Sequence, residues 1–327
     1  FAPLREIISL NPVDSNWNEK TMRTIRLAYR DHDRTPVIYC IKAMAERHYG
    51  VHVAVLHIEP QREFEAALFD RSCDVIIEHI EYLHTEAAKG RKATLFCAPQ
   101  IQRGLQLVVP RSFNSLEDLK GKAMAVRDLG RPHRITLWLR KVGLENSVKT
   151  IIVPDKEVGR WQQWRKVVSG ECVACFMAPI YLPAAIAAGL KTFPASEAEI
   201  VSLFAQACLA EFGRNNSALM KDYLKAVIHA LALLIYRRDE AMEIIAEEPM
   251  RLMRLTDHGE LRRQVDSIAE LLQVKPYPTI EAIVNTDEIA TQEYGPTLEN
   301  PLTLWDLHWL KELDDEGFID NLIASLS

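Results

Sequence analysis

The sequence predicts an α/β protein of two lobes, in which mixed, mostly parallel sheets are flanked by helices and an interlobe cleft holds a ligand. At 327 residues with 48% hydrophobic content, the chain is large enough to bury a core in each lobe. Short apolar runs alternate with segments of helical spacing, an order that favours parallel strands joined by crossover helices. The alternation occurs twice before a mainly helical stretch, so we expect the second series to form a lobe inserted within the first.

The first series opens with a strand at residues 24–29 and a polar turn. After that turn, Thr35 is expected to cap a helix whose first residue is Pro36, and Gly50 is expected to end it. The series continues with strands expected at residues 51–58 and 74–78, and helices expected at 64–69 and 82–89.

The second series opens with two strands in close succession, and a short helix is expected to start at Ser115. Strands are expected at residues 92–98, 104–109, 122–126, 148–153, 173–176 and 199–209, and helices at 132–141, 158–168, 178–188, 217–237, 239–247, 260–271 and 303–316.

These elements predict a division of the chain at the two crossings between lobes. We expect a first lobe of residues 22–103 and 202–327, with the helical return at its end. Residues 104–201 are expected to form the inserted lobe, and residues 1–21 an N-terminal arm.

Composition and charge exclude several classes of protein. The formal net charge is −6 and basic residues are scattered, so we expect no nucleic-acid partner. No apolar run approaches the length of a bilayer span, so we expect no membrane insertion. Residues 1–20 lack the basic start, apolar stretch and cleavage site of a signal peptide.

The six cysteines are spread thinly and lie mostly in apolar runs, which is typical of buried free thiols. This usage favours a cytoplasmic location, whereas a leader removed from the chain would fit a periplasmic or extracytoplasmic one. Cys172 and Cys175 have the spacing of a zinc or redox motif, but no second pair accompanies them. We therefore favour two residues of a strand. No metal-binding, phosphate-binding or nucleophile motif occurs, and we expect no cofactor and no metal.

Three stretches resemble one family of proteins. They are residues 114–122 (NSLEDLKGK), residues 168–171 before a strand that ends at Ala178 and Pro179, and the tail from residue 301 to 319. They resemble solute-binding proteins for sulfonates, nitrate, taurine and thiamine precursors. The resemblance covers nearly the whole chain from about residue 24. It implies the type 2 periplasmic-binding-protein topology, a small organic anion in the cleft, and an ABC-transporter permease as partner.

A narrower resemblance indicates an enzyme. The turn Asp-His-Asp-Arg-Thr at residues 31–35 is similar to the Asp-x-Asp-Arg-Thr turn of 4,5-dihydroxyphthalate decarboxylases, which share the fold. The glutamate-containing turn associated with those enzymes is replaced by Arg-Asp-Leu-Gly-Arg at residues 127–131. The resemblance implies, as an alternative, a cofactor-independent decarboxylase or lyase of an aromatic acid.

The ends of the strands predict where a ligand binds. In open α/β sheets, ligands lie beyond the carboxyl ends of the strands, and helix N-termini there favour anions. Arg34 and Arg131 lie beside two such termini, and a guanidinium group suits a carboxylate, sulfonate or phosphate. The candidate ligand-binding residues are Asp31, His32, Arg34, Thr35, His79, Gly130, Arg131, His133, Arg160, Trp161 and Pro179.

Each candidate has a plainer structural interpretation, which stays open. Arg34 could pair with Asp31 or Asp33 as a clamp within its own turn. His79, and with it His32, would move a proton if the protein is an enzyme. Alternatively, His79 pairs with Glu78 or Glu81 at the rim of the cleft.

The remaining candidates have similar alternatives. His32 and His133 would meet over a ligand after closure, or each is a surface turn residue. Trp161 would contact a ligand with Arg160, or it packs on a helical face with Trp164 and Val168. Two functions therefore remain, a binding protein for a small anion and a lyase, and we favour the binding protein.

Overall fold

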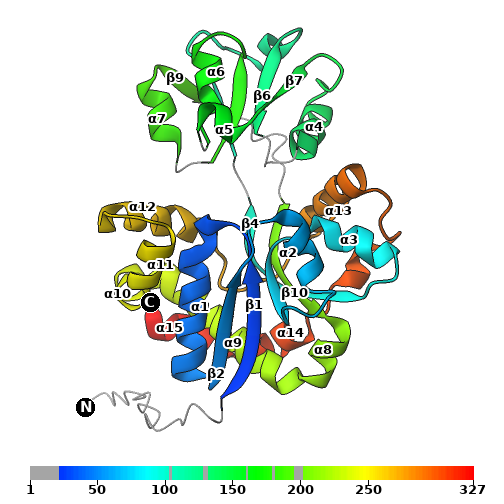
Figure 1. The fold of residues 1–327 in the computed structure, drawn as a ribbon, viewed down its shortest axis with the longest axis vertical. Coiled ribbons are helices and arrows are strands. Elements are labelled where there is room, and N and C mark those ends of the chain that lie inside the picture. Colours follow the sequence, from blue (N-terminus) through cyan, green and yellow to red (C-terminus); the bar gives the residue numbers. More distant parts are fainter. Residues whose placement is uncertain (1–21, 103–104, 128–131, 160, 179–180, 195–201) are drawn as a thin grey trace, which may run out of the picture.

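The computed structural model describes residues 22–102, 105–127, 132–159, 161–178, 181–194 and 202–327. Two five-stranded sheets form two lobes, one above the other in Figure 1. Helices flank both sheets, so the predicted two-lobed α/β architecture is confirmed. The predicted N-terminal arm, residues 1–21, lies outside the described residues.

The sheet of the first lobe has the strand order β2-β1-β3-β10-β4. β1 pairs in parallel with β2 and β3, whereas β10 is antiparallel to β3 and β4. The carboxyl ends of β1, β2 and β3 therefore meet at one edge, as the sequence predicted. The strands are β1 (Arg23–Tyr29), β2 (Val51–His57), β3 (Val75–His79), β4 (Ala93–Gln102) and β10 (Ser202–Leu209).

The sheet of the second lobe repeats this pattern with the order β7-β6-β8-β5-β9. β6 is parallel to β7 and β8, and β5 is antiparallel to β8 and β9. β9 was not predicted. The strands are β5 (Gln106–Pro110), β6 (Ala123–Arg127), β7 (Lys149–Val153), β8 (Ala174–Met177) and β9 (Leu190–Phe193).

Each sheet is covered on both faces. In the first lobe, α1 and α9 cover one face, and the apolar residues of α9 are buried over most of its length. α2, α3 and α13 cover the other face. The helices of this lobe are α1 (Thr35–His48), α2 (Gln61–Ala67), α3 (Glu81–Ala88), α8 (Ala210–Asn215), α9 (Ser217–Tyr236), α10 (Arg238–Ile245), α11 (Glu247–Leu252), α12 (His258–Ala269), α13 (Ile280–Tyr294), α14 (His308–Asp315) and α15 (Phe318–Leu326).

The second lobe is smaller and has the same three layers. Trp138 of α4 packs on one face of its sheet, and Val167 of α6 and Ala185 of α7 pack on the other. Its helices are α4 (Pro132–Lys141), α5 (Asp155–Val158), α6 (Trp164–Val168) and α7 (Leu182–Ala187). Three 3₁₀ turns complete the two lobes: η2 (His32–Arg34), η3 (Leu116–Leu119) and η7 (Pro301–Leu304).

The start of α1 differs from its prediction. Thr35 is the first residue of the helix rather than its cap, and the preceding residues form η2. Asp31 caps η2, because its side chain accepts a hydrogen bond from the backbone N–H of Asp33 at 3.3 Å. The Thr35 hydroxyl lies 3.2 Å from the Tyr29 hydroxyl and is buried. Thr35 therefore ties α1 to β1 and does not face the cleft.

The helix predicted at residues 158–168 is wrong. The segment is split into α5 and α6 by Gly159 (φ 96°) and Trp161 (φ 56°), both in the left-handed region that an α-helix excludes. Trp161 therefore does not share a helical face with Trp164 and Val168, and the packing explanation for Trp161 is also wrong.

The C-terminal helix predicted at residues 303–316 starts later, at His308. Trp305 lies before it and forms an isolated β-bridge with Leu95. Trp309 is on α14 and packs edge-to-face on Phe96 in the core, as expected. α13 and α15 were not predicted.

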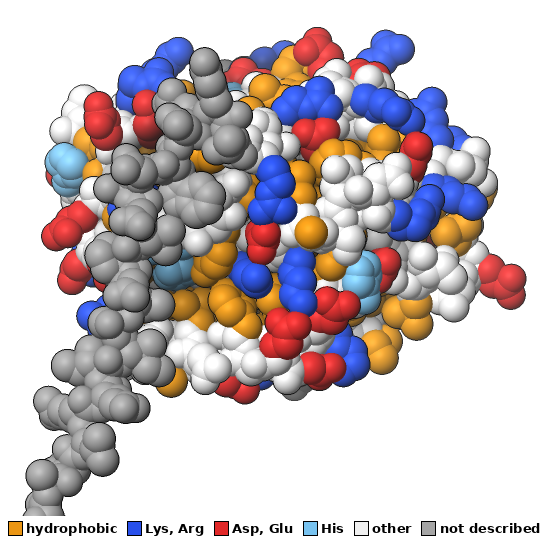
Figure 2. All heavy atoms as spheres, turned by 90° about the horizontal axis from the view of Figure 1, so that it is seen from below, with side chains coloured by type: hydrophobic (Ala, Val, Ile, Leu, Met, Phe, Trp, Pro, Cys, Tyr) orange, Lys and Arg blue, Asp and Glu red, His pale blue; other side chains and the backbone are white. Residues whose placement is uncertain are grey.

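The strands of the second sheet all lie between residues 106 and 193, which supports an inserted lobe of residues 104–201. That boundary, and a first lobe of residues 22–103 and 202–327, remain predictions. In the described residues, every helix is too short or too polar to cross a lipid bilayer. On the lower face of the first lobe, basic and acidic side chains are interspersed (Figure 2).

The cysteines are free and buried. Cys175 belongs to β8 and Cys172 lies just before it. Burial raises the pKa of both thiols, which disfavours the thiolate that a redox or metal site needs. The structure thus supports the interpretation of this pair as structural residues.

Candidate functional site

The candidate site begins at the carboxyl edge of the first sheet, where Arg34 is nearly buried. Its side chain lies in η2, after β1, and the residue is 7% exposed. The guanidinium carbon lies 4.5 Å from the centroid of the Phe204 ring on β10. The Nε atom is buried and has no hydrogen-bond partner among the described residues. Arg34 is therefore a buried cation that rests on an aromatic ring.

Glu78 holds the turns after β1 and β3 together. Its carboxylate accepts hydrogen bonds from the backbone N–H groups of Asp31 at 2.9 Å and His79 at 3.1 Å. Burial raises the pKa of Glu78, the charge of Asp31 raises it further, and the charge of Arg34 opposes the rise. Glu78 thus brings Asp31, Arg34 and His79 into one neighbourhood.

His79 lies at the end of β3 and is partly exposed. Its Nδ1 atom is 3.8 Å from a carboxylate oxygen of Glu81, and its ring stands edge-on to Phe204 with centroids 6.2 Å apart. The pairing with Glu81 that the sequence allowed is present. The side chain of Glu78 instead holds the backbone of His79.

A second group of residues lies at the carboxyl edge of the second sheet. Arg127, the last residue of β6, donates from Nε to both carboxylate oxygens of Asp155, at 3.0 and 2.8 Å. Burial opposes ionisation of Asp155, but hydrogen bonds from Arg127 and Gln163 outweigh it and lower its pKa. The pair is therefore ionised at neutral pH and fixes the guanidinium plane.

Trp161 lies between a cation and a second aromatic ring. The guanidinium carbon of Arg127 is 4.5 Å from the Trp161 ring centroid. The ring of Tyr181 stacks on Trp161 with centroids 5.6 Å apart and an interplanar angle of 17°. The indole Nε1 atom is buried, and no described residue hydrogen-bonds to it. The left-handed backbone at Trp161 turns this side chain toward Tyr181 instead of along a helix.

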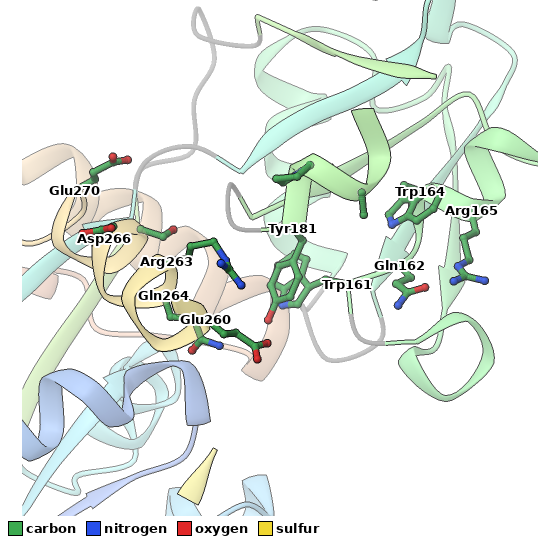
Figure 3. Close-up of a pocket in the computed structure, with 13 residues that line it drawn as sticks. Trp161, Gln162, Trp164, Arg165, Tyr181, Glu260, Arg263, Gln264, Asp266 and Glu270 are labelled. Carbon is green, nitrogen blue, oxygen red and sulfur yellow. The ribbon is translucent and has the colours of Figure 1, made fainter. Parts of the chain in front are cut away.

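A cavity of about 780 Å³ lies between the two lobes at this stack. Trp161, Trp164 and Tyr181 line it from the second lobe, and Arg263 and Gln264 of α12 line it from the first. Figure 3 shows Arg263 pointing across the space toward the two stacked rings. The cavity is therefore the described part of an interlobe cleft with an aromatic wall.

Several predicted site residues lie outside the described residues: Gly130, Arg131, Arg160, Pro179 and the side chain of His133. The predicted meeting of His32 and His133 is therefore not tested. His32 is directed away from Arg34's neighbourhood toward the end of β2, where its Nε2 atom lies 3.0 Å from Glu59. Asp31, Arg34 and His79 do come together at one edge.

Sequence reasoning missed four residues of the site. Arg127 and Asp155 follow strands, so the rule that placed Arg34 at the site could have found them. Tyr181 and Arg263 give no such signal. Tyr181 depends on the irregular backbone at Trp161, and Arg263 depends on how α12 faces the second lobe.

Sequence comparisons give no match: no model of a protein family matches the chain, and neither does any curated protein. Solved structures do match. A chain from Methylobacillus flagellatus, named as a periplasmic sulfonate-binding protein, superposes with TM-score 0.68 at 16% identity, over 91% of this chain and 96% of that one. The periplasmic aliphatic sulphonate-binding protein of Escherichia coli gives 0.60 at 15% identity, over 83% and 87%.

The alkanesulfonate-binding protein of Xanthomonas axonopodis pv. citri, solved with MOPS bound, gives TM-score 0.57 at 13% identity, over 87% of this chain and 98% of that one. At this identity the likeness concerns the fold. The strand order of both sheets, the flanking helices and these superpositions agree with the topology that the sequence motifs implied. The chain therefore has the two-lobed fold of the type 2 periplasmic-binding-protein superfamily.

Proposed function

We propose that this chain is a solute-binding protein that holds a small organic anion, a carboxylate or a sulfonate, in the cleft between its lobes. The observation that carries the proposal is Arg34, a guanidinium group that is 7% exposed and has an unpartnered Nε atom at the edge where ligands bind in this fold. A buried cation is unfavourable without a partner, and an anionic ligand would supply one.

The aromatic wall suits the organic part of such a ligand. Trp161 and Tyr181 present stacked faces to the cavity, and Arg127 holds Trp161 from behind. A cavity of about 780 Å³ is of the size that small-molecule sites have. Arg131, Arg160 and His133 are retained as candidates from the second lobe. The proteins named for sulfonate binding share the fold, and an ABC-transporter permease is the partner that this function implies.

The proposal is tested by replacing Arg34 with alanine. We expect binding of alkanesulfonates or carboxylates, followed by titration calorimetry and native mass spectrometry, to weaken by about 10- to 100-fold, the effect of losing a charge-assisted hydrogen bond. Arg23→Ala is the matched control, because Arg23 is half exposed and pairs with Asp222 at the opposite end of β1. Equal affinities in the two variants would remove Arg34 from the site.

Glu78 supports a lyase as a second candidate. It is a buried carboxyl whose pKa is raised, and it adjoins His79 at the cleft edge, as acid and base groups often do in active sites. In a decarboxylase, His79→Gln would abolish release of carbon dioxide from an aromatic acid while changing affinity only a few fold. Recovery of every tested aromatic acid unchanged from the wild-type protein would contradict this candidate.

A further inference from the structure

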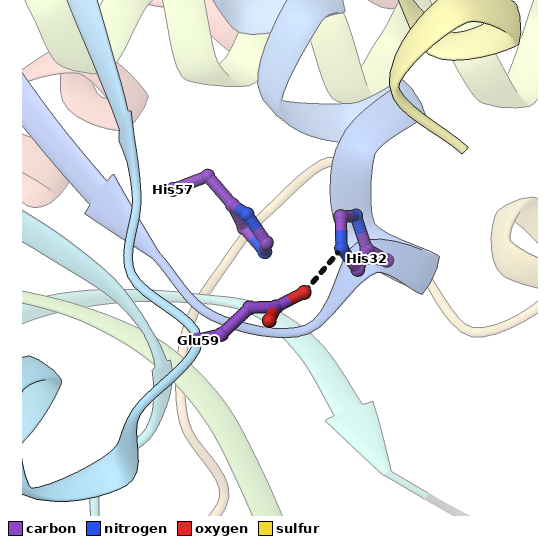
Figure 4. Close-up of side chains that lie close together, drawn as sticks. All are labelled: His32, His57 and Glu59. Carbon is purple, nitrogen blue, oxygen red and sulfur yellow. Dashed lines mark hydrogen bonds and ion pairs between the residues drawn. The ribbon is translucent and has the colours of Figure 1, made fainter. Parts of the chain in front are cut away.

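Three side chains that can ligate a metal converge at the ends of β1 and β2. They are His32 in η2, His57 at the end of β2, and Glu59 two residues later (Figure 4). One ligand atom from each lies within 4.8 Å of the other two. These residues lie on the side of Arg34's turn that faces β2.

We propose that His32, His57 and Glu59 form a binding site for a divalent transition-metal ion of the zinc class. Two imidazoles and one carboxylate are a donor set that zinc accepts, and three protein ligands leave one position open for water or for an oxygen of a ligand. The inference goes beyond the proposed anion binding and does not depend on it.

The distances allow coordination with little movement. Bonds of about 2.0–2.2 Å in a tetrahedron place ligand atoms about 3.3–3.6 Å apart. His32 Nε2 and Glu59 Oε1 are already 3.0 Å apart. The rest of the set needs to contract by about 1 Å. The Glu59 side chain is 70% exposed and follows the strand, so it can rotate without disturbing packing.

The hydrogen bond of His57 prepares its ring for a metal. Nε2 of His57 lies 2.9 Å from the backbone carbonyl oxygen of Arg30. A carbonyl oxygen only accepts, so Nε2 carries the proton and Nδ1 of the neutral ring keeps its lone pair. A carbonyl that fixes the tautomer in this way is the usual outer partner of a metal-bound histidine.

The metal-free alternative is a stack of rings. His57 lies between Tyr29 and His32, with centroid distances of 4.9 and 4.0 Å. Such a stack needs the ring shapes but not the nitrogen lone pairs or the carboxylate of Glu59. The two interpretations therefore differ in what a substitution at Glu59 does.

The experiment is a zinc titration of tag-free protein by competition with a chromophoric chelator. We expect one equivalent to bind, and His32→Gln, His57→Gln and Glu59→Gln each to weaken binding at least about 10-fold. His52→Gln is the matched control. His52 is on the same strand and pairs through Nδ1 with Glu46 at 2.7 Å, and the structure places no second imidazole with this pair among the described residues.

A second readout separates a lost site from a damaged fold. Cobalt bound in a tetrahedral site of nitrogen and oxygen ligands gives a strong visible absorption, which we expect in the wild type and in His52→Gln. Glu59→Gln changes an exposed side chain and should keep the circular dichroism spectrum while losing this absorption. Absence of zinc binding in the wild type, or unchanged binding in Glu59→Gln, would overturn the proposal.

Discussion

His229 shows how strongly burial alters a single residue in this fold. It lies on α9, where Tyr49 Oη is 3.2 Å from its Nδ1 atom and the ring of His48 is 4.9 Å away. Burial lowers the pKa of His229 to about 4, and the neighbouring His48 lowers it further. The folded protein therefore holds His229 in its neutral form.

This shift predicts a loss of stability in mild acid. The folded pKa is below the unfolded value of about 6.5, so the unfolded chain takes up a proton first as the pH falls between those values. From pH 7 to pH 5, this one group should lower the free energy of unfolding by about 2 kcal/mol. Urea denaturation of wild type and His229→Gln at both pH values measures the difference.

The control for this measurement is His258→Gln, since His258 is exposed at the start of α12. His258→Gln should keep the wild-type dependence on pH, while His229→Gln should flatten it. The same fall in stability between pH 7 and pH 5 in all three proteins would show that His229 is not the group responsible.

At the scale of elements, the sequence predicted best where one pattern governs a segment. α9 and the strands at the sheet centres are apolar over their whole length and are buried, so periodicity alone located them. The break between α5 and α6 could not be predicted in this way. The apolar spacing there continues through Trp161, and the left-handed backbone depends on the tertiary contacts of its ring with Arg127 and Tyr181.

α13 was missed for a related reason. It serves both lobes, so its buried residues do not form one stripe, and it buries the polar residues Asn285 and Thr286 while exposing Ile280 and Val284. A helix shared between two cores has no single hydrophobic face for a sequence pattern to reveal.

The candidate site follows the same division. Arg34 and His79 were predicted because the ends of parallel strands meet at one edge, which is a property of topology. The cavity between α12 and the Trp161–Tyr181 stack depends on how the lobes dock, and no local pattern encodes that contact.

On the scale of the whole molecule, α13 also links the lobes. Ile283 on this helix is buried in the core of the first lobe, whereas Ile289 is buried in the core cluster of the second. Polar contacts surround Ile289, since Lys141 of α4 donates to Asn285 at 2.9 Å and Arg140 pairs with Glu288 at 2.8 Å. These half-exposed ion pairs contribute little, so the apolar contact is the main term.

Ile289→Ala is therefore expected to loosen the arrangement of the lobes. The variant removes apolar contact only across the lobes, so the docked arrangement loses stability relative to a more open one. Small-angle scattering should show a larger radius of gyration than in the wild type.

Ile283→Ala provides the comparison, because Ile283 lies on the same helix and is also buried, at 3% exposure against 1% for Ile289. Each substitution should destabilise the fold by about 2–5 kcal/mol, so both variants lose a similar amount of packing. Only Ile289→Ala changes a contact between lobes, and only it should expand the molecule. If both variants keep the wild-type radius of gyration at equal loss of stability, the strand crossings alone hold the lobes, and α13 is a helix of the first lobe that the second merely touches.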